Sequence, residues 1–277
     1  MEPQPVVRPL RLSDLPGLMD LVRAARWNQT QDDWRHILEL EPEGAIGLEI
    51  GGRLACSATA ICYGRDLAWI GMVLTLPEYR GRGFARRLML AALDFIERRG
   101  VAWTKLDATD MGHHLYETLG FRDEQTVERW RREPFAGGEF VEAALGSELD
   151  AELDRAAFGA DRSRLLDFFR RFEAASVAGG GFAMGRPGNA AAYFGPCVCR
   201  RPEVARVLLE WFLARHAQEP VYWDLLPANR EAARMAEEYG FEKQRILARM
   251  ARPSPGVSAP LEKHDALVFG LAGFEFG

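Results

Sequence analysis

The chain has 277 residues, of which 48% are apolar, and a formal net charge of −5. These values are typical of one large or two ordinary folded domains, and they argue against disorder and against general binding to nucleic acid or to an anionic membrane. No apolar run reaches the ~18 residues of a transmembrane helix, and the four cysteines lack C-x-x-C or metal-ligand spacing, so we expect a cytoplasmic protein with reduced thiols and no metal.

The first half of the sequence predicts a mixed α/β arrangement. A short extended run is followed by two helices, the second of which spans residues 30–40 and begins at a Thr30 or Asp32 cap. Two strands joined by a glycine turn come next. The remaining elements are a buried central strand at 67–76, a helix at 84–99, a strand at 101–109, a short helix at 112–119 and a last strand at 121–133.

The segment YRGRGFARRLM joins the end of the buried strand to the start of the following helix. A helix N-terminus presents unpaired N–H groups and a positive dipole, Gly81 and Gly83 permit close backbone approach, and the arginines add forked donors. Together these features predict a pyrophosphate cradle, and the alternative is a solvated basic turn with capping glycines. The segment matches neither a P-loop nor the three-glycine dinucleotide fingerprint.

Two motifs together resemble the GCN5-related N-acetyltransferase (GNAT) family, over residues 5–134. Its [QR]-x-x-G-x-[GA] loop is matched by Arg80, Gly83 and Ala85, and its Leu-Tyr-Glu-x-Leu-Gly-Phe ending is matched by residues 115–121. The resemblance implies acetyl-CoA as a co-substrate. It also implies an N-acetyltransferase that moves the acetyl group to a primary amine by direct attack in a ternary complex.

The resemblance further implies roles for individual residues. Tyr116 is the expected acid that protonates the leaving thiolate, and Thr109 stands where many family members carry a cofactor-contacting Asn. The general base stays open among Asp107, Asp110, His113 and water. The residues expected to contact the cofactor, through the strand edge and the loop backbone, are Met72, Val73, Leu74, Arg80, Gly81, Arg82, Gly83, Phe84 and Ala85.

The second half repeats the first in weakened form. Gly195 aligns with Gly71, and the Tyr-Gly-Phe ending aligns with Leu-Gly-Phe, but residues 202–205 lack the arginine-glycine loop. Ala236 stands at the position of Tyr116. The second half therefore keeps strand and helix patterns while it loses the predicted phosphate cradle and the expected acid.

The repeat predicts two tandem GNAT-like domains, each a mostly antiparallel twisted sheet flanked by helices. We expect a catalytic domain at residues 1–136 and a degenerate domain at 137–277, with the boundary in the glycine-containing stretch 135–139. The closing run at 264–277 alternates like a strand and is predicted to close the second sheet.

The acceptor pocket is expected beside the first two helices, where the family builds it. Trp27 and Trp34 would share a face if one helix ran through both, and Asn28 and Asp33 add polar and anionic groups suited to an amine. The alternative is a helix-capping loop with core tryptophans. We expect a small-molecule or peptide amine as the partner and a monomer or homodimer; the alternative function is a non-catalytic acyl-CoA sensor.

Overall fold

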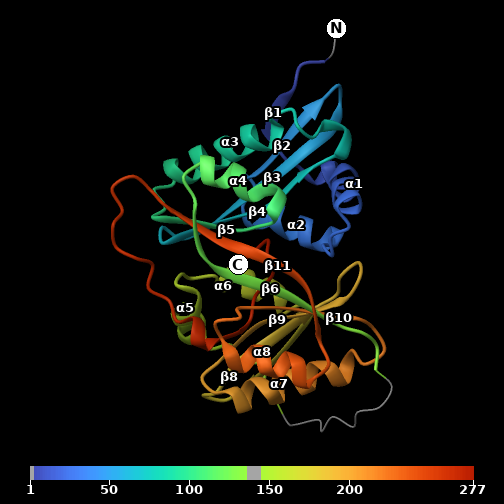
Figure 1. The fold of residues 1–277 in the computed structure, drawn as a ribbon, viewed down its shortest axis with the longest axis vertical. Helices are drawn as coiled ribbons and strands as arrows, with labels where there is room; N and C mark the ends of the chain where they lie inside the picture. The colour runs from blue at the N-terminus through green and yellow to red at the C-terminus, as the bar shows by residue number, and fades with distance from the viewer. Residues whose placement is uncertain (1–2, 136–144) are drawn as a thin grey trace.

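A computed structural model describes residues 3–135 and 145–277. Across these residues twelve strands form one sheet in the order β1-β2-β3-β4-β5-β11-β6-β10-β9-β8-β7, with β12 beside β9. The first half of the chain lies at the upper end of Figure 1 and the second half at the lower end, and the strands of the two halves meet in the middle. The predicted mixed α/β fold with mostly antiparallel strands is confirmed.

The first-half elements follow the order expected from the sequence. The Thr30 hydroxyl accepts a hydrogen bond from the Asp33 amide at 3.3 Å, so Thr30 is the cap of the second helix. The elements are β1 (Val6–Pro9), α1 (Leu15–Ala25), α2 (Gln31–Leu40), β2 (Ala45–Ile50), β3 (Arg53–Tyr63), β4 (Leu67–Thr75), α3 (Phe84–Arg98), β5 (Trp103–Ala108), α4 (Asp110–Thr118) and β6 (Arg122–Arg132).

The second half repeats the order strand, helix, strand, helix, strand. Only Arg200 and Arg201 separate β9 from α7, so the arginine-glycine loop is absent there. The Asn229 side chain caps α8 by accepting from the Ala232 amide at 3.2 Å. The elements are α5 (Ala151–Phe158), α6 (Ser163–Phe169), β7 (Glu173–Val177), β8 (Gly181–Arg186), β9 (Ala192–Cys199), α7 (Pro202–Arg215), β10 (Val221–Leu225), α8 (Arg230–Glu238), β11 (Glu242–Pro253) and β12 (Val268–Gly270).

The two halves exchange their last long strands. β11, from the second half, lies between β5 and β6 and pairs antiparallel with both. β6, from the first half, pairs antiparallel with β10 of the second half. Each half therefore completes the sheet of the other, as the crossing of β6 and β11 at the centre of Figure 1 shows.

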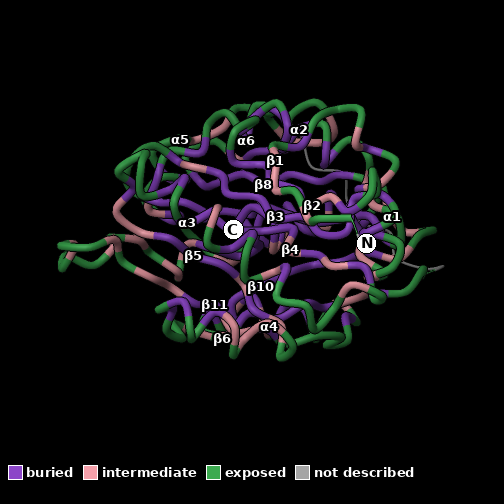
Figure 2. Tube along the Cα trace, turned by 90° about the horizontal axis from the view of Figure 1, so that it is seen from above, coloured by how far each residue is buried: buried purple, intermediate pink, exposed green. Residues whose placement is uncertain are grey.

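Helices cover both faces of the sheet and enclose the three large apolar clusters of the described residues. On one face, α3 and α4 cover the first-half strands, and α7 and α8 cover the second-half strands. On the other face, helices from both halves share one cluster whose buried aromatic side chains include Trp34, Trp69, Phe158, Phe169 and Phe276. Figure 2 shows the buried trace running through the middle of the molecule between exposed outer segments.

The closing segment, defined here as residues 271–277, is not the strand that the alternation predicts. Regular strand structure ends at Gly270, and the chain then turns back, with the Gly277 amide donating to the Gly273 carbonyl at 2.8 Å. A φ of +125° at Gly273 is unfavourable for other residues and breaks the strand. The Tyr63 hydroxyl and the Trp69 indole donate to carbonyls of the segment, at 2.8 Å and 2.9 Å, which fixes it against the first half.

Two aligned glycines give the closing segment room. A Cβ at Gly71 would lie 2.8 Å from the Glu275 Cα, and a Cβ at Gly195 would lie 2.1 Å from the Leu271 carbonyl oxygen. The backbone of the closing segment therefore approaches the same position of the repeat in each half. Residues 136–139, most of the predicted boundary stretch, lie outside the described residues. Within the described ranges, no helix is both long and apolar enough to cross a membrane.

Candidate active site

An opening in the sheet lies between β4 and β5. The two strands pair in parallel only from Leu67–Trp103 to Trp69–Lys105. β5 is paired along its whole length with β11 on its other side. Beyond Trp69 the edge of β4 is therefore not paired with β5, and its backbone groups face the opening.

A bulge shapes this free edge of β4. Two residues, Met72 and Val73, lie between the pairs Ser57–Leu74 and Thr59–Gly71, where β3 has only one. Met72 has φ of +49°, and the Ser57 hydroxyl donates to its carbonyl oxygen at 2.8 Å. A bulge takes a residue out of the ladder and re-aims its polar groups, so backbone donors are available here to a ligand that lies along β4.

An outer cavity of about 930 Å³ extends from this edge to the start of α3 and to α4. Arg82 is not among its lining residues, because its guanidinium lies over the rings of Tyr79 and Phe84, at 5.9 Å and 5.1 Å. The cavity brings together most of the predicted site, namely Trp27, Val73, Leu74, Arg80, Gly81, Gly83, Phe84, Ala85, Thr109 and Tyr116.

The loop before α3 has the chemistry that a pyrophosphate needs. Gly81 and Gly83 have φ of +73° and +75°, and a Cβ on either would meet nothing within 4 Å. The first N–H groups of α3 have no intrahelical acceptor, and they belong to residues that line the cavity. With the guanidinium groups of Arg80 and Arg86, this donor set fits the pyrophosphate of a coenzyme A thioester.

A smaller inner cavity, of about 60 Å³, continues from the outer one. Five residues line both cavities and lie where the cavities meet, namely Trp27, Val73, Thr109, Tyr116 and Arg245. The remaining predicted strand residue, Met72, lines the inner cavity alone. The polar and aromatic side chains that complete the inner wall are Gln29, Asp107, Arg129, Phe274 and Glu275.

Tyr116 lies at this junction with its ring packed on α4. A Cβ at Gly112 would lie 2.8 Å from the ring, so only a glycine fits beneath it. Tyr116 is 8% exposed, and burial, with a smaller effect from Cys56, raises the pKa of its hydroxyl. The phenol is therefore protonated at neutral pH and is able to donate a proton.

The carboxylates of the inner cavity are bound by arginines of the second half. Arg249 donates to both oxygens of Asp107, at 2.8 Å and 2.9 Å. Arg186 donates to Glu275 at 3.0 Å. Burial raises the pKa of Asp107 and of Glu275, and their arginine partners oppose that shift.

The residues expected to bind the acceptor separate into two groups. Trp27 lies in the loop before α2 and lines both cavities, but it shares no helix with Trp34. Trp34 is fully buried in the shared core. Asn28 donates to the Ala191 carbonyl at 3.0 Å. The Asp33 carboxylate accepts a hydrogen bond from the amide of the cap residue Thr30 and lies 3.3 Å from Arg186, so Asn28 and Asp33 both connect the halves outside the two cavities.

The candidate bases lie in different surroundings. Asp107 is buried and paired with Arg249. His113, a half-buried residue of α4, lies 2.8 Å from Asp123 at the start of β6, and neither it nor the exposed Asp110 lines the inner cavity. Within residues 3–135 and 145–277, no group of three or more His, Cys, Asp or Glu side chains is arranged to hold a metal ion.

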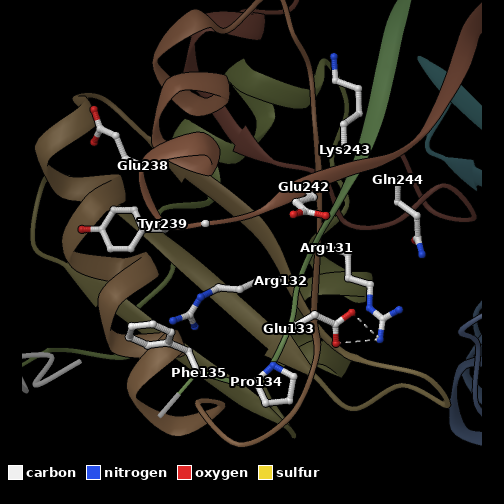
Figure 3. A pocket seen from close by; sticks show the side chains of 11 residues that line it. Arg131, Arg132, Glu133, Pro134, Phe135, Glu238, Tyr239, Glu242, Lys243 and Gln244 are labelled. Atoms are coloured by element: carbon white, nitrogen blue, oxygen red, sulfur yellow. Dashed lines mark hydrogen bonds and ion pairs between the residues drawn. The ribbon is translucent and has the colours of Figure 1, made fainter. Parts of the chain in front are cut away.

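A separate cavity of about 660 Å³ lies on the second half, where β6 ends and β11 begins. In Figure 3 the Arg132 side chain points toward Phe135 and Tyr239, while Arg131 pairs with Glu133 at 3.1 Å. None of the predicted site residues lines this cavity, and it borders the part of the chain that is not described. We therefore place the candidate site at the β4–β5 opening.

Family models match both halves of the chain. One, for the acetyltransferase (GNAT) family, matches residues 15–121, which include the β4 edge, the loop and α4. Another, for an acetyltransferase (GNAT) domain, matches residues 151–267. The chain belongs to the GNAT acetyltransferases. The tandem arrangement expected from the sequence is confirmed.

Solved GNAT-like structures share this fold. A putative acetyltransferase from Pyrococcus horikoshii has a TM-score of 0.85 at 21% identity, covering 99% of this chain and 96% of its own. A GCN5-related N-acetyltransferase from Sphaerobacter thermophilus has a TM-score of 0.65 at 17% identity, and the match covers 92% of this chain and 98% of that protein. A tandem GNAT protein of the clavulanic acid biosynthesis pathway has a TM-score of 0.63 at 15% identity, and the match covers 91% of this chain and 100% of that protein. A search among curated proteins found no match.

The GNAT motifs locate the loop and Tyr116 but not the far wall of the inner cavity. That wall includes Arg245 on β11 and residues Phe274 and Glu275 of the closing segment. No local pattern in the sequence marks these residues, because Arg245 reaches the site through the exchange of strands, and Phe274 and Glu275 reach it through the turn of the closing segment. Gly112 carries a local signal, since a glycine one helical turn before Tyr116 leaves room for the ring.

Proposed function

We propose that this GNAT protein transfers the acetyl group of acetyl-CoA to a primary amine by direct attack in a ternary complex. The observation that carries the proposal is the junction of the two cavities, which the buried Tyr116 of α4 and Val73 of the free β4 edge both line. Acetyl-CoA, when bound, supplies a thioester carbonyl that an amine nitrogen attacks. The outer cavity suits the coenzyme, and the inner cavity suits the reacting part of the amine.

The residues of the first half have distinct tasks in this proposal. Backbone N–H groups of residues 80–85, with Arg80 and Arg86, hold the pyrophosphate. The edge at Met72, Val73 and Leu74 pairs with the pantetheine arm as an added strand would. N–H groups of the bulged edge stabilise the negative charge that develops on the carbonyl oxygen.

Tyr116 supplies the proton for the leaving thiolate. Its raised pKa keeps the hydroxyl protonated, and a thiolate that accepts this proton leaves as a neutral thiol. The amine loses its own proton to water or to a group that we leave unassigned, because Asp107 is bound to Arg249 and His113 lies outside the inner cavity.

We also propose one coenzyme site per chain, in the first of two domains divided at residues 136 and 137. The connection from β9 to α7 has no glycine loop, and Ala236 stands where the first half has Tyr116. The degenerate second domain then has a structural part in the enzyme.

Turnover tests the proposal against the alternative of an acyl-CoA sensor. Purified protein is supplied with acetyl-CoA and a panel of primary amines, and free thiol release and the acetylated amine are both measured. We expect release that depends on one class of amine. Tight acetyl-CoA binding with no turnover on any amine would identify a sensor instead.

Calorimetry with acetyl-CoA tests the single site. We expect one site per chain, and binding that Gly83→Val weakens sharply, because the new side chain would occupy the open space of the loop and strain a φ of +75°. Gly64→Val, at another positive-φ glycine in open space on the β3–β4 turn, is the matched control. Two equivalent sites per chain would contradict the proposed loss of the second one.

A further inference from the structure

Arg245 is a cation at the junction of the two cavities that has no partner among residues 3–135 and 145–277. Across the described residues it makes no hydrogen bond and no ion pair, whereas the other charged side chains of the inner wall are paired. Asp107 is bound by Arg249, Arg129 by Asp224 and Glu275 by Arg186. Arg245 is therefore the charged group of this wall that is left for a ligand.

The strand exchange brings Arg245 to this place. β11 runs on past the end of β5, since its pairing with β5 starts only at Ala248 and Ala108. The part of β11 before Ala248 thus forms a wall beside Thr109 and the start of α4. A bulge at Gln244 sets the register in which Arg245 and Leu247 share the face toward the inner cavity.

Keeping Arg245 here has an electrostatic cost. In the β6–β11 ladder it stands directly opposite Arg129, and like charges on opposite cross-strand positions destabilise a sheet. Arg245 is exposed and Arg129 is bound by Asp224, so this cost is small, but the pairing of the two strands gives no reason of its own for a second cation at this position.

The inner cavity has a second group suited to the same ligand. Gln29 is 6% exposed, and its amide nitrogen donates to Glu275 at 2.9 Å. Its buried oxygen Oε1 has no hydrogen-bond partner among the described residues, and the side chain lines the inner cavity. A carbonyl oxygen accepts the N–H groups of an amine, so the wall offers an acceptor for an amine and a cation for an anion.

We propose that Arg245 selects the acceptor by binding its carboxylate, and that the substrates are small amino carboxylates. This inference rests on the proposed acetyl transfer. A guanidinium matches a carboxylate with two parallel hydrogen bonds. The inner cavity of about 60 Å³ suits a small molecule, and Arg245 disfavours a polyamine, whose further charges are positive.

The test compares matched acceptors in the full-length protein. The common α-amino acids, β-alanine and 4-aminobutyrate are each paired with the amide or the decarboxylated amine. For wild type we expect turnover to favour the carboxylates. Arg245→Gln should raise the KM of the best carboxylate roughly 10–100-fold, the loss of a charge-assisted hydrogen bond, while the KM of acetyl-CoA and the turnover of the uncharged partner change little.

Controls separate this role from a structural one. Arg65→Gln removes an arginine in the exposed β3–β4 turn, away from both cavities, and should leave all constants unchanged. Arg245→Lys should recover part of the affinity. The melting temperature of Arg245→Gln should equal or exceed that of wild type, because the charge opposite Arg129 is gone.

Equilibrium binding of the amino carboxylates tests the role of Arg245 without requiring turnover. The same amino carboxylates are titrated into wild type and Arg245→Gln in the presence of CoA. Turnover on amines with an unchanged carboxylate preference in Arg245→Gln would overturn the role of Arg245 and leave the acetyl transfer standing. If no amine is acetylated, acetyl transfer fails, and weaker carboxylate binding by Arg245→Gln would still support the selective site.

Discussion

At the scale of single residues, Tyr116 owes its properties to its neighbours. Gly112 leaves space beneath its ring, and burial raises the pKa of its hydroxyl. A phenol with a raised pKa stays protonated across the neutral range, so ionisation of Tyr116 should not limit the rate between pH 6 and 9. Its hydroxyl is therefore a proton donor whose loss a simple substitution tests.

Tyr116→Phe should keep the affinity for acetyl-CoA and lower kcat about 100-fold, the low end for general acid–base catalysis. The ring and its packing stay, and only the proton donor is lost. Steady-state kinetics with the best amine and calorimetry with acetyl-CoA check the two parts. Tyr79→Phe, at the half-exposed tyrosine of the outer cavity, is the matched control, and equal kcat values for the two variants would assign the acid to water or to another side chain.

The sequence predicts a site residue well when its signal is local. Arg80, Gly83 and Tyr116 occupy fixed places in two short motifs, and the structure brings them to one cavity. Asn28 and Asp33 have side chains that suit a ligand or a structural contact equally, and only their tertiary neighbours, Ala191 and Arg186, distinguish these uses. Arg245 and Glu275 carry no local signal at all, since they are distant in sequence from both motifs.

At the scale of elements, α2 carries a buried titratable residue into the core between the halves. His36 stacks on Phe168 of α6, with ring centroids 3.5 Å apart. Burial, with added repulsion from Arg171, Arg164 and Arg186, lowers its pKa to about 3. The native state therefore binds no proton at His36 at pH 5, whereas the unfolded chain does.

Stability should therefore fall as the pH drops from 7 to 5, inside the window between the unfolded pKa near 6.5 and the folded value near 3. Between pH 7 and pH 5, His36 should lower the free energy of unfolding by about 2 kcal/mol. His36→Phe keeps a flat ring on Phe168 and should reduce the acid destabilisation by that amount in denaturant unfolding. His114→Phe, at an exposed histidine of α4, should not, and identical pH profiles for wild type and His36→Phe would contradict the assignment.

Most elements could be predicted because they are locally determined. Hydrophobic periodicity marks α3 and α4, and glycines at positive φ follow both helices. The closing segment could not be predicted, since its alternating residues fit a strand but Gly273 turns the chain. The position of β6 also escaped local reasoning, because a strand pattern does not state which neighbour it pairs with.

At the scale of the whole molecule, the exchange of β6 and β11 makes the halves depend on each other. β11 covers the edge of β5 and supplies Arg249 to the buried Asp107. The closing segment adds Phe276 to a core that also contains Trp34 and Trp69. Removing the second half would expose this core and leave a buried carboxylate without its partner.

Residues 1–136 alone should therefore be insoluble, or should melt at least about 10 °C below the full chain, because breaking a buried ion pair costs about 3–5 kcal/mol. Solubility and thermal unfolding, with and without acetyl-CoA, check this. Adding residues 137–277 in trans should recover folding if strand pairing is the cause. A soluble first fragment with the melting temperature and activity of the full chain would instead give the second half another task.

The exchange of β6 and β11 also determines when the first half can complete its fold during translation. Asp107 and Arg249 are 142 residues apart in the chain, and translation at roughly 5–20 residues per second separates their appearance by about 7–28 s. During that interval β5 has emerged without the strand that covers its edge, and the first half, although it carries the acetyltransferase motifs, lacks one wall of its inner cavity. We therefore expect activity only once translation has passed β11 and the closing segment. Until then the nascent chain presents an unpaired strand edge to chaperones or to neighbouring nascent chains.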